Sequence, residues 1–458
     1  MAWRAEVGKM APRREDVVPA DEARKDVNSN SLPGFKRYPT NRDHPLKSAP
    51  KWIKGKREDD AVGPYWRIHD GLYDLTEFAE SHPGGKVWIE STQGTDITEA
   101  FESAHLGTRS QAVLPKYFVG HAEGPRNSPY TFHEDGFYKT FKRKVRPVLR
   151  EVGTGPDWPM TLIQDGLASA TAVSVLAACL LDSSAFAVLG GVLLAMTSMC
   201  AHNFFHQRDN WRMFLFDLTL LSSYDWRITH GLSHHLFTNT IYDFEVSILE
   251  PFWEFLPKPE KNFLQRYGSY VYEYLLIPSA MYLEALKRIC LVLSGEAPLR
   301  PENLLPLLEL VAMALAAPSL GAALRLWLVL HVACSSWFTG VGLVVAHHHP
   351  EIYHEGDAMR EDRDWGLCQL DAVRDRVEVT GNLFLIATSF GDHSLHHLLP
   401  TVDHSKLKYV YPVFLETCKE FNIPFSFKNQ WEMVRGKYLQ LANNKPNQCP
   451  PGYKSKTG

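Results

Sequence analysis

Histidines gather in three short groups between residues 202 and 397. Imidazole is a common ligand for iron, copper and zinc, so these groups are candidates for metal binding. Residues four apart share one face of a helix, which lets each group direct its imidazoles to one place. Eight histidines exceed the needs of one zinc ion and suit two metal ions with open positions for oxygen. The groups are His202-Asn-Phe-Phe-His206, His230-Gly-Leu-Ser-His234-His235 and His393-Ser-Leu-His396-His397.

A separate pair of histidines lies nearer the N-terminus. His82 belongs to the sequence HPGG, and His105 follows further along the chain. Two imidazoles on opposite walls of an apolar slot would complete the coordination of haem iron and leave no position for oxygen. The alternative is an ordinary turn and a surface histidine. The candidate slot walls are Phe78, Ile89, Phe101 and Leu106.

The size and charge of the chain exclude some function classes. With 458 residues the chain is expected to hold more than one structural unit, and its net charge of −4 is close to neutral. No domain carries the basic excess of a nucleic-acid-binding protein. The seven cysteines are scattered without CxxC pairs, which excludes a cysteine-rich zinc site.

Long uncharged stretches lie next to the histidine groups. Residues 166–181 and 185–201 carry no charge and are separated by Asp182-Ser183-Ser184, which predicts a helical hairpin across a membrane. A second hairpin is predicted with helices near 304–320 and 325–346. The basic residues of 139–150 precede the first hairpin, so the positive-inside rule puts that side in the cytosol. Residues 251–293 fit an interfacial helix or a packed cytosolic helix equally well.

The segment around His82 and His105 resembles the cytochrome b5 family. The resemblance covers residues 52–121 and is carried by WRIHDGLYDLTEFAESHPGG and GTDITEAFESAH. It implies a small α+β domain that binds haem b, with His82 and His105 as the axial ligands.

The three histidine groups and their neighbours resemble the membrane fatty-acid desaturase family over residues 158–410. Trp226 precedes the second group, Thr238-Asn239 follows it, and Leu398-Leu399-Pro400 follows the third. The resemblance implies a pair of non-haem iron ions held by His202, His206, His230, His234, His235, His393, His396 and His397. His347 is an additional candidate ligand, because the family often adds one histidine after its fourth span.

Two positions depart from that family's pattern. The second group has three residues between its first two histidines, where many desaturases have two. The third group begins with His393, where desaturases with a fused haem domain often have glutamine. These departures leave the substrate open, including acyl-chain length and double-bond position.

The two resemblances together imply a fold and a domain order. The fold class is a small α+β haem domain followed by an all-α transmembrane domain of two helical hairpins with a cytosolic histidine-rich cap. The expected units are a loosely ordered leader (1–50), the haem domain (51–125), a linker with the basic juxtamembrane segment (126–157), the desaturase-like domain (158–410) and a soluble C-terminal tail (411–458).

The implied function is the introduction of a double bond into a fatty-acyl lipid with O2, using electrons from the fused haem domain. No dinucleotide-binding glycine fingerprint follows a strand, so an external NADH-dependent cytochrome b5 reductase is expected to reduce the haem. The expected location is the endoplasmic reticulum membrane, with the haem domain and both termini in the cytosol. The alternatives are a lipid hydroxylase of similar architecture and a non-catalytic membrane haem protein for electron transfer.

Overall fold

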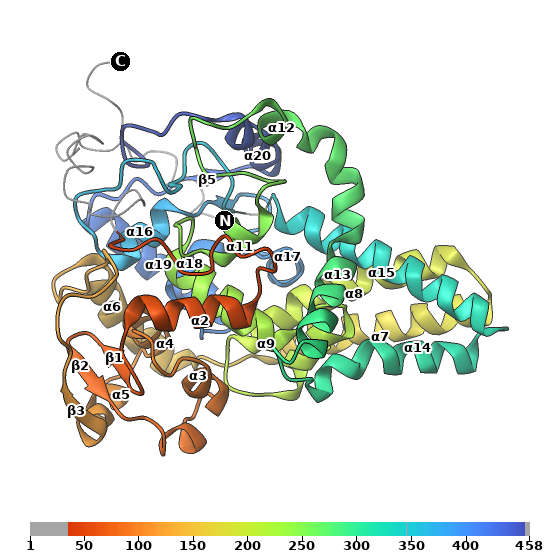
Figure 1. Cartoon of the computed structure of the whole chain (residues 1–458), viewed down its shortest axis with the longest axis horizontal. Helices are drawn as coiled ribbons and strands as arrows, with labels where there is room; N and C mark the ends of the chain where they lie inside the picture. The colour runs from red at the N-terminus through yellow and green to blue at the C-terminus, as the bar shows by residue number, and fades with distance from the viewer. Residues whose placement is uncertain (1–34, 345, 454–458) are drawn as a thin grey trace.

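The computed structural model describes residues 35–344 and 346–453. A long group of apolar helices extends from one end of the molecule, and the small sheet lies at the other end beside a helical cap (Figure 1). The predicted order of a small α+β domain and a helical domain is confirmed.

The small domain is built on a three-stranded antiparallel sheet in the order β1-β2-β3. Trp66 pairs with Tyr73 and Gly71 with His121. Trp66, Ile68 and Phe101 belong to its own apolar core, because alternate strand residues face the short helices. The strands are β1 (Trp66–Ile68), β2 (Gly71–Tyr73) and β3 (Phe118–His121). The helices are α2 (Ala49–Asp60), η3 (Ala79–Ser81), α3 (Lys86–Ser91), α4 (Thr98–Ala104), α5 (Arg109–Val113) and η4 (Leu114–Tyr117).

Within the described residues, three helices are long and apolar enough to cross a membrane: α7 (Trp158–Leu180), α8 (Ser184–Phe205) and α15 (Leu320–Gly342). α7 and α8 form the first predicted hairpin. The N-terminus of α7 is capped by Asp157, whose side chain accepts a hydrogen bond from the Met160 amide. At the tip of the hairpin Asp182 pairs with Arg325 of α15 at 2.6 Å, so the turns of both hairpins lie at one end (Figure 1).

The second hairpin differs from its prediction in one arm. The helix predicted over 304–320 is α14 (Leu305–Ala316), preceded by the short 3₁₀ turn η7 (Pro301–Leu304). Its 12 residues rise about 18 Å, which is less than the roughly 30 Å of a bilayer core. Pro318 follows the helix, and a proline disfavours the helical conformation of the residue before it.

The stretch over 251–293 contains one long helix, α13 (Ser269–Leu293). One face packs on α15, where Ser335 Oγ lies 3.3 Å from the Met281 amide. The other face leaves large apolar side chains exposed, including Leu275 and Leu293. An apolar face without protein cover favours the interfacial interpretation over a packed cytosolic helix.

The cap is formed by short elements that follow α8 in the chain. It includes a parallel pair of two-residue strands, β4 (Asp375–Arg376) and β5 (Phe427–Lys428). The cap elements that precede α13 are η5 (Trp211–Leu218), α9 (Ser223–Trp226), the π-helix η6 (Arg227–His234), α10 (His235–Phe237), α11 (Phe244–Leu249) and α12 (Phe263–Tyr267). The later helices are α16 (Trp365–Asp371), α17 (Leu383–Thr388), α18 (His393–Leu398), α19 (His404–Glu420) and α20 (Gln430–Ala442).

Both predicted end segments are more ordered than expected. Residues 1–34 of the leader lie outside the described residues, but Phe35 is buried against Tyr242, and Arg42 forms a buried ion pair with Glu250 at 2.8 Å. The predicted soluble tail continues α19 and adds α20, where Lys437 pairs with Glu273 of α13. Hydrophobic burial and buried charge pairs in these segments could not be read from their polar composition.

The predicted linker contains a buried helix, α6 (Phe137–Val152). Phe137, Phe141 and Val145 are fully buried on one side of it. Lys139 and Lys142 turn toward the small domain and bind Glu102 of α4 at 2.7 and 3.1 Å. The basic run, interpreted as a membrane-orientation signal, therefore also attaches the small domain to the cap.

Candidate metal and haem sites

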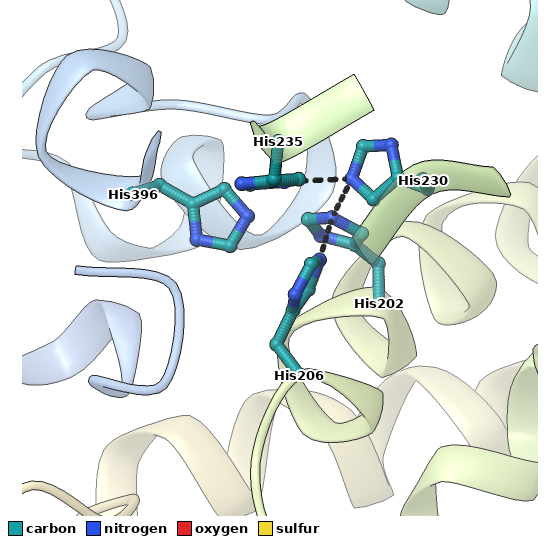
Figure 2. Close-up of side chains that lie close together, drawn as sticks. All are labelled: His202, His206, His230, His235 and His396. Atoms are coloured by element: carbon teal, nitrogen blue, oxygen red, sulfur yellow. Dashed lines mark hydrogen bonds between the residues drawn. The ribbon is translucent and has the colours of Figure 1, made fainter. Parts of the chain in front are cut away.

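Five of the predicted histidines converge on one point under the cap (Figure 2). The Nε2 atom of His202 lies 2.7 Å from that of His230 and 3.0 Å from that of His206. The donor atoms of the group all lie within 4.8 Å of one another, so one metal ion could bind among them. This first cluster consists of His202, His206, His230, His235 and His396.

Four further histidines form a second cluster beside the first. The Nε2 atom of His347 lies 3.1 Å from that of His234 and 2.7 Å from that of His393. His347, the additional candidate from the loop after α15, therefore joins the groups predicted from the histidine boxes. The second cluster consists of His234, His347, His393 and His397.

The clusters fit two metal ions better than they fit a purely hydrogen-bonded core. All nine side chains are buried or nearly so, which disfavours their charged forms. The buried Nε2 atoms of His396 and His397 have no hydrogen-bond partner among the described residues. Burial, followed by the nearby His397, holds the pKa of His235 well below its usual value, so its ring is neutral and able to coordinate.

The extra residue in the second histidine group is accommodated by a change of helix type. Residues Arg227–His234 form a π-helix, in which backbone hydrogen bonds join residues five apart. His234 and His235, four and five residues after His230, therefore both lie near the side of the helix that carries His230. His234 consequently faces the second cluster while His235 and His230 share the first, with 3.0 Å between the Nε2 atoms of the latter two.

The small domain brings its two predicted haem ligands next to each other, with their ring planes inclined at 76°. The ring centroids of His82 and His105 are 6.3 Å apart, which leaves room for one metal ion between them. The Nδ1 atom of each ring bonds a backbone carbonyl, Gly85 at 3.0 Å and Phe101 at 2.8 Å. That bond fixes the tautomer whose Nε2 atom is free to coordinate. Burial lowers the pKa of His105 to about 4, so its ring is neutral.

Two family models match the chain. The fatty acid desaturase model matches residues 183–429, and the model of the cytochrome b5-like haem/steroid binding domain matches residues 52–123. The first match covers more than half of the sequence.

The chain belongs to the fatty acid desaturase family. The Cytochrome b5-related protein of Drosophila melanogaster is 42% identical over 420 residues, which are 91% of this chain and 96% of the relative. More distant relatives include Acyl-lipid (8-3)-desaturase B of Dictyostelium discoideum, 23% identical over 83% of this chain and 92% of that protein. Acyl-lipid (8-3)-desaturase of Physcomitrium patens is 24% identical over 94% of this chain and 98% of that protein. No solved structure matches the chain.

In this desaturase-family chain a second layer of residues orients the histidines. Asp243, at the N-terminus of α11, lies 2.9 Å from the Nδ1 atom of His234, and Glu245 contacts Nδ1 of His230. An acceptor on Nδ1 leaves Nε2 available for metal. Burial alone would lower the pKa of His234, but Glu245 and Asp243 outweigh it and raise the pKa to about 9. A cation that binds there must displace that proton.

Sequence reasoning missed a tenth histidine and both carboxylates. The Nε2 atom of His404 lies 3.2 Å from Nδ1 of His396, and His404 is fully buried beside the first cluster. The signal for Asp243 and Glu245 was their position shortly after the second histidine group. The Oε1 atom of Gln369 lies 3.1 Å from Nδ1 of His397.

The desaturase domain also holds a large apolar cavity that reaches the second cluster. Its volume is about 710 Å³, and its walls come from the cap, from α13, from the end of α15, from α2 and from the end of α3. His234, His347 and His393 line its inner end, whereas of the first cluster only His230 does. Its apolar wall includes Leu249, Leu276, Leu283, Leu291 and Phe338.

Proposed function

We propose that this chain is a membrane oxidoreductase that forms a carbon–carbon double bond in a fatty-acyl chain. In the overall reaction two neighbouring methylenes lose one hydrogen each. One O2 is reduced to two waters with two further electrons and two protons. The opening of the second histidine cluster into an apolar cavity is the observation that carries the proposal, because that cavity suits an alkyl chain.

The cofactors of this proposal are haem b and two non-haem iron ions. His82 and His105 would hold the haem. The first cluster would hold one iron ion and the second cluster the other. When bound, the iron pair supplies the oxygen chemistry that unreactive C–H bonds require. The contribution of the chain is to orient part of the imidazole set through Nδ1 contacts, to exclude water and to place the acyl chain beside His234, His347 and His393. The imidazoles with Nδ1 contacts are those of His230, His234, His347, His396 and His397.

The fused haem domain would supply the electrons, and an external NADH-dependent cytochrome b5 reductase would reduce the haem. We further propose that the protein resides in the endoplasmic reticulum membrane with the haem domain, the cap and both termini in the cytosol. The basic residues of α6 lie at the cap end and the hairpin turns at the opposite end, which is the polarity that the positive-inside rule favours. Protease protection of sealed microsomes would test this orientation.

Expression in a host of defined lipid composition tests the reaction. A product lighter by two hydrogens supports desaturation, and a product heavier by one oxygen assigns the chain to the lipid hydroxylases. Replacement of His234 by alanine should abolish the product while the low-spin haem spectrum persists. Iron analysis should give the haem iron plus two further ions per chain, and haem iron alone would contradict catalysis at the clusters.

A further inference from the structure

The loop that carries His82 lies directly against the first histidine group. A Cβ atom at Gly85 would lie only 2.5 Å from the carboxylate of Asp209, so no larger residue fits without movement. Asp209 follows His206 by three residues and forms an ion pair with Arg227 of η6 at 2.6 Å. The haem-ligand loop therefore touches the segment between the first and second histidine groups.

The segment that carries His105 is attached to the third histidine group. The hydroxyl of Thr401, just after α18, donates a hydrogen bond to the carbonyl of Ala104 at 3.2 Å. Tyr138 of α6 lies between the two segments, with its hydroxyl 3.0 Å from the carbonyl of Leu398 and 3.3 Å from that of Glu102. Both predicted haem-ligand segments thus face the cap that holds the metal clusters.

One aromatic side chain spans the remaining gap. Trp88 belongs to α3, the helix that follows the His82 loop, and its ring lies against Gly231 of η6. A Cβ atom at Gly231 would lie 3.1 Å from Cη2 of Trp88 and 3.9 Å from Cε1 of His206. Those two ring atoms are therefore separated by no more than the sum of these distances. The guanidinium of Arg227 stacks over the indole at 5.1 Å and fixes its orientation.

The two clusters face different neighbours as a result. His206 of the first cluster lies beside Trp88 and the haem domain. His234, His347 and His393 of the second cluster face the acyl cavity. Of the first cluster, His230 lines the cavity as well, and so does Ser91 at the end of α3.

We propose that Trp88 is the contact through which electrons pass from the haem domain to the first cluster, while the second cluster faces the substrate. The inference rests on the proposed function. Each transfer oxidises one ferrous haem to the ferric form and reduces one ferric ion of the pair to the ferrous form. Two transfers occur per reaction, and a nicotinamide-dependent flavin reductase restores the ferrous haem each time.

Stopped-flow spectroscopy of the full-length protein tests this route. The haem is reduced without oxygen, the protein is mixed with O2 and acyl lipid, and reoxidation of the haem is followed by its visible absorption. We expect Trp88→Leu to slow reoxidation by about one to two orders of magnitude, as in other steps that depend on close approach. The haem spectrum and the iron content should stay as in the wild type. Reoxidation of Trp88→Leu at the wild-type rate would overturn the proposal.

A matched tryptophan separates the electron route from domain attachment. Trp52 of α2 also joins the N-terminal part to the cap, since its Nε1 atom donates to the carbonyl of Tyr242 at 3.0 Å. The haem of the Trp52→Leu variant should be reoxidised at the wild-type rate. Trp88→Phe keeps a ring against Gly231 and should show a smaller slowing while hydrogen exchange of α6 stays at the wild-type level. The proposal fails if two results occur together. The haem of Trp88→Phe is reoxidised at the wild-type rate, and the slow reoxidation in Trp88→Leu is accompanied by faster hydrogen exchange in α6. Trp88 is then a docking residue only.

A second arm distinguishes failure of this route from failure of the proposed function. A low-potential dye mediator reduces the iron pair directly, so the Trp88 variants should then form as much product as the wild type. If the wild type forms no product even with the mediator, the desaturase proposal fails. If the wild type does form product but the Trp88 variants reoxidise their haem at the wild-type rate, only the electron route fails.

Discussion

At the scale of single residues, the fold gives two adjacent histidines different surroundings. His347 and His348 are neighbours, yet only His347 belongs to the second cluster. Its Nδ1 atom lies 2.9 Å from the carbonyl of Ala372, which directs Nε2 toward His234 and His393. His348 instead stacks on Phe255, with ring centroids 3.5 Å apart. The carbonyl acceptor at Ala372 is what the sequence could not supply.

We predict that His347→Ala removes one of the two non-haem iron ions and abolishes turnover. A four-histidine site that loses one ligand and exposes its cavity should bind iron about 10–100-fold more weakly or worse. Iron analysis together with the haem spectrum measures the loss. His348→Phe keeps the stack on Phe255 and should retain full iron. Equal iron loss in both variants would show that the whole loop, and not the ligand, matters.

At the scale of elements, the sequence predicted the apolar helices well and the cap poorly. The uncharged stretch 166–181 lies within α7 except for its last residue, the C-cap of the helix, and 185–201 lies within α8. Hydrophobicity alone is enough to predict a spanning helix. The same rule overestimated α14, where length is limited by Pro318 and by packing. The π-helix η6 was not predictable, because its hydrogen bonds are favoured by surrounding tertiary contacts and not by local propensity.

The histidine boxes were predictable as groups, but their division between two clusters was not. His234 and His235 are adjacent in sequence and belong to different clusters. That division depends on the helix type of η6 and on Asp243 and Glu245, which orient His234 and His230 from a separate helix. Long-range contacts of this kind leave no periodic signal in the sequence.

A prediction at this scale concerns the loop that carries His82. Gly85 has φ +108° and ψ 143°, a region essentially restricted to glycine, and its missing side chain makes room for Asp209. We expect Gly85→Ala to destabilise the protein by about 1–3 kcal/mol for the backbone alone. Displacement of Asp209 from Arg227 should add about 1 kcal/mol. Thermal unfolding of the protein, followed by its haem absorption band, measures the total loss of stability.

Gly356→Ala is the control for backbone strain. Gly356 has a similar φ of +102°, but a Cβ atom there would meet only ordinary contacts, the nearest at 3.8 Å. The difference between the two variants reports the contact between the haem-ligand loop and the cap. No difference would mean that this contact contributes nothing to attachment.

At the scale of the whole molecule, the large apolar cavity joins parts that are distant in sequence. Ala280 of α13 lines the cavity, whereas Ala285 of the same helix packs into the apolar core beside it. We predict that Ala280→Phe excludes longer acyl chains and shifts the products toward shorter ones, because the ring fills the cavity. Lipid analysis by mass spectrometry measures the shift. Ala285→Phe should change stability without changing chain-length preference, and an equal shift in both would contradict the assignment of the cavity.

Also at the scale of the whole molecule, the attachment of the haem domain to α6 depends on one buried carboxylate. Glu102 is 2% exposed and binds Lys139 and Lys142 of α6 together with His69. Burial alone would raise its pKa, but the bond to His69 and the charge of Lys142 outweigh burial and lower it. The carboxylate is therefore ionised at neutral pH and neutralises two cations that are themselves removed from water.

We predict that Glu102→Ala costs about 3–5 kcal/mol of stability, because Lys142 loses its carboxylate partner and Lys139 keeps only the exposed Glu134. Because the pair joins α4 to α6, the loss should appear as faster hydrogen exchange in both helices and as slower haem reoxidation. Glu134 is the matched control, since it also approaches Lys139, at 3.7 Å, but its side chain is 81% exposed. Glu134→Ala should change neither measurement, because solvent screens an exposed pair. If Glu102→Ala leaves haem reoxidation at the wild-type rate despite the faster exchange, electron transfer does not require the haem domain to be held against the cap.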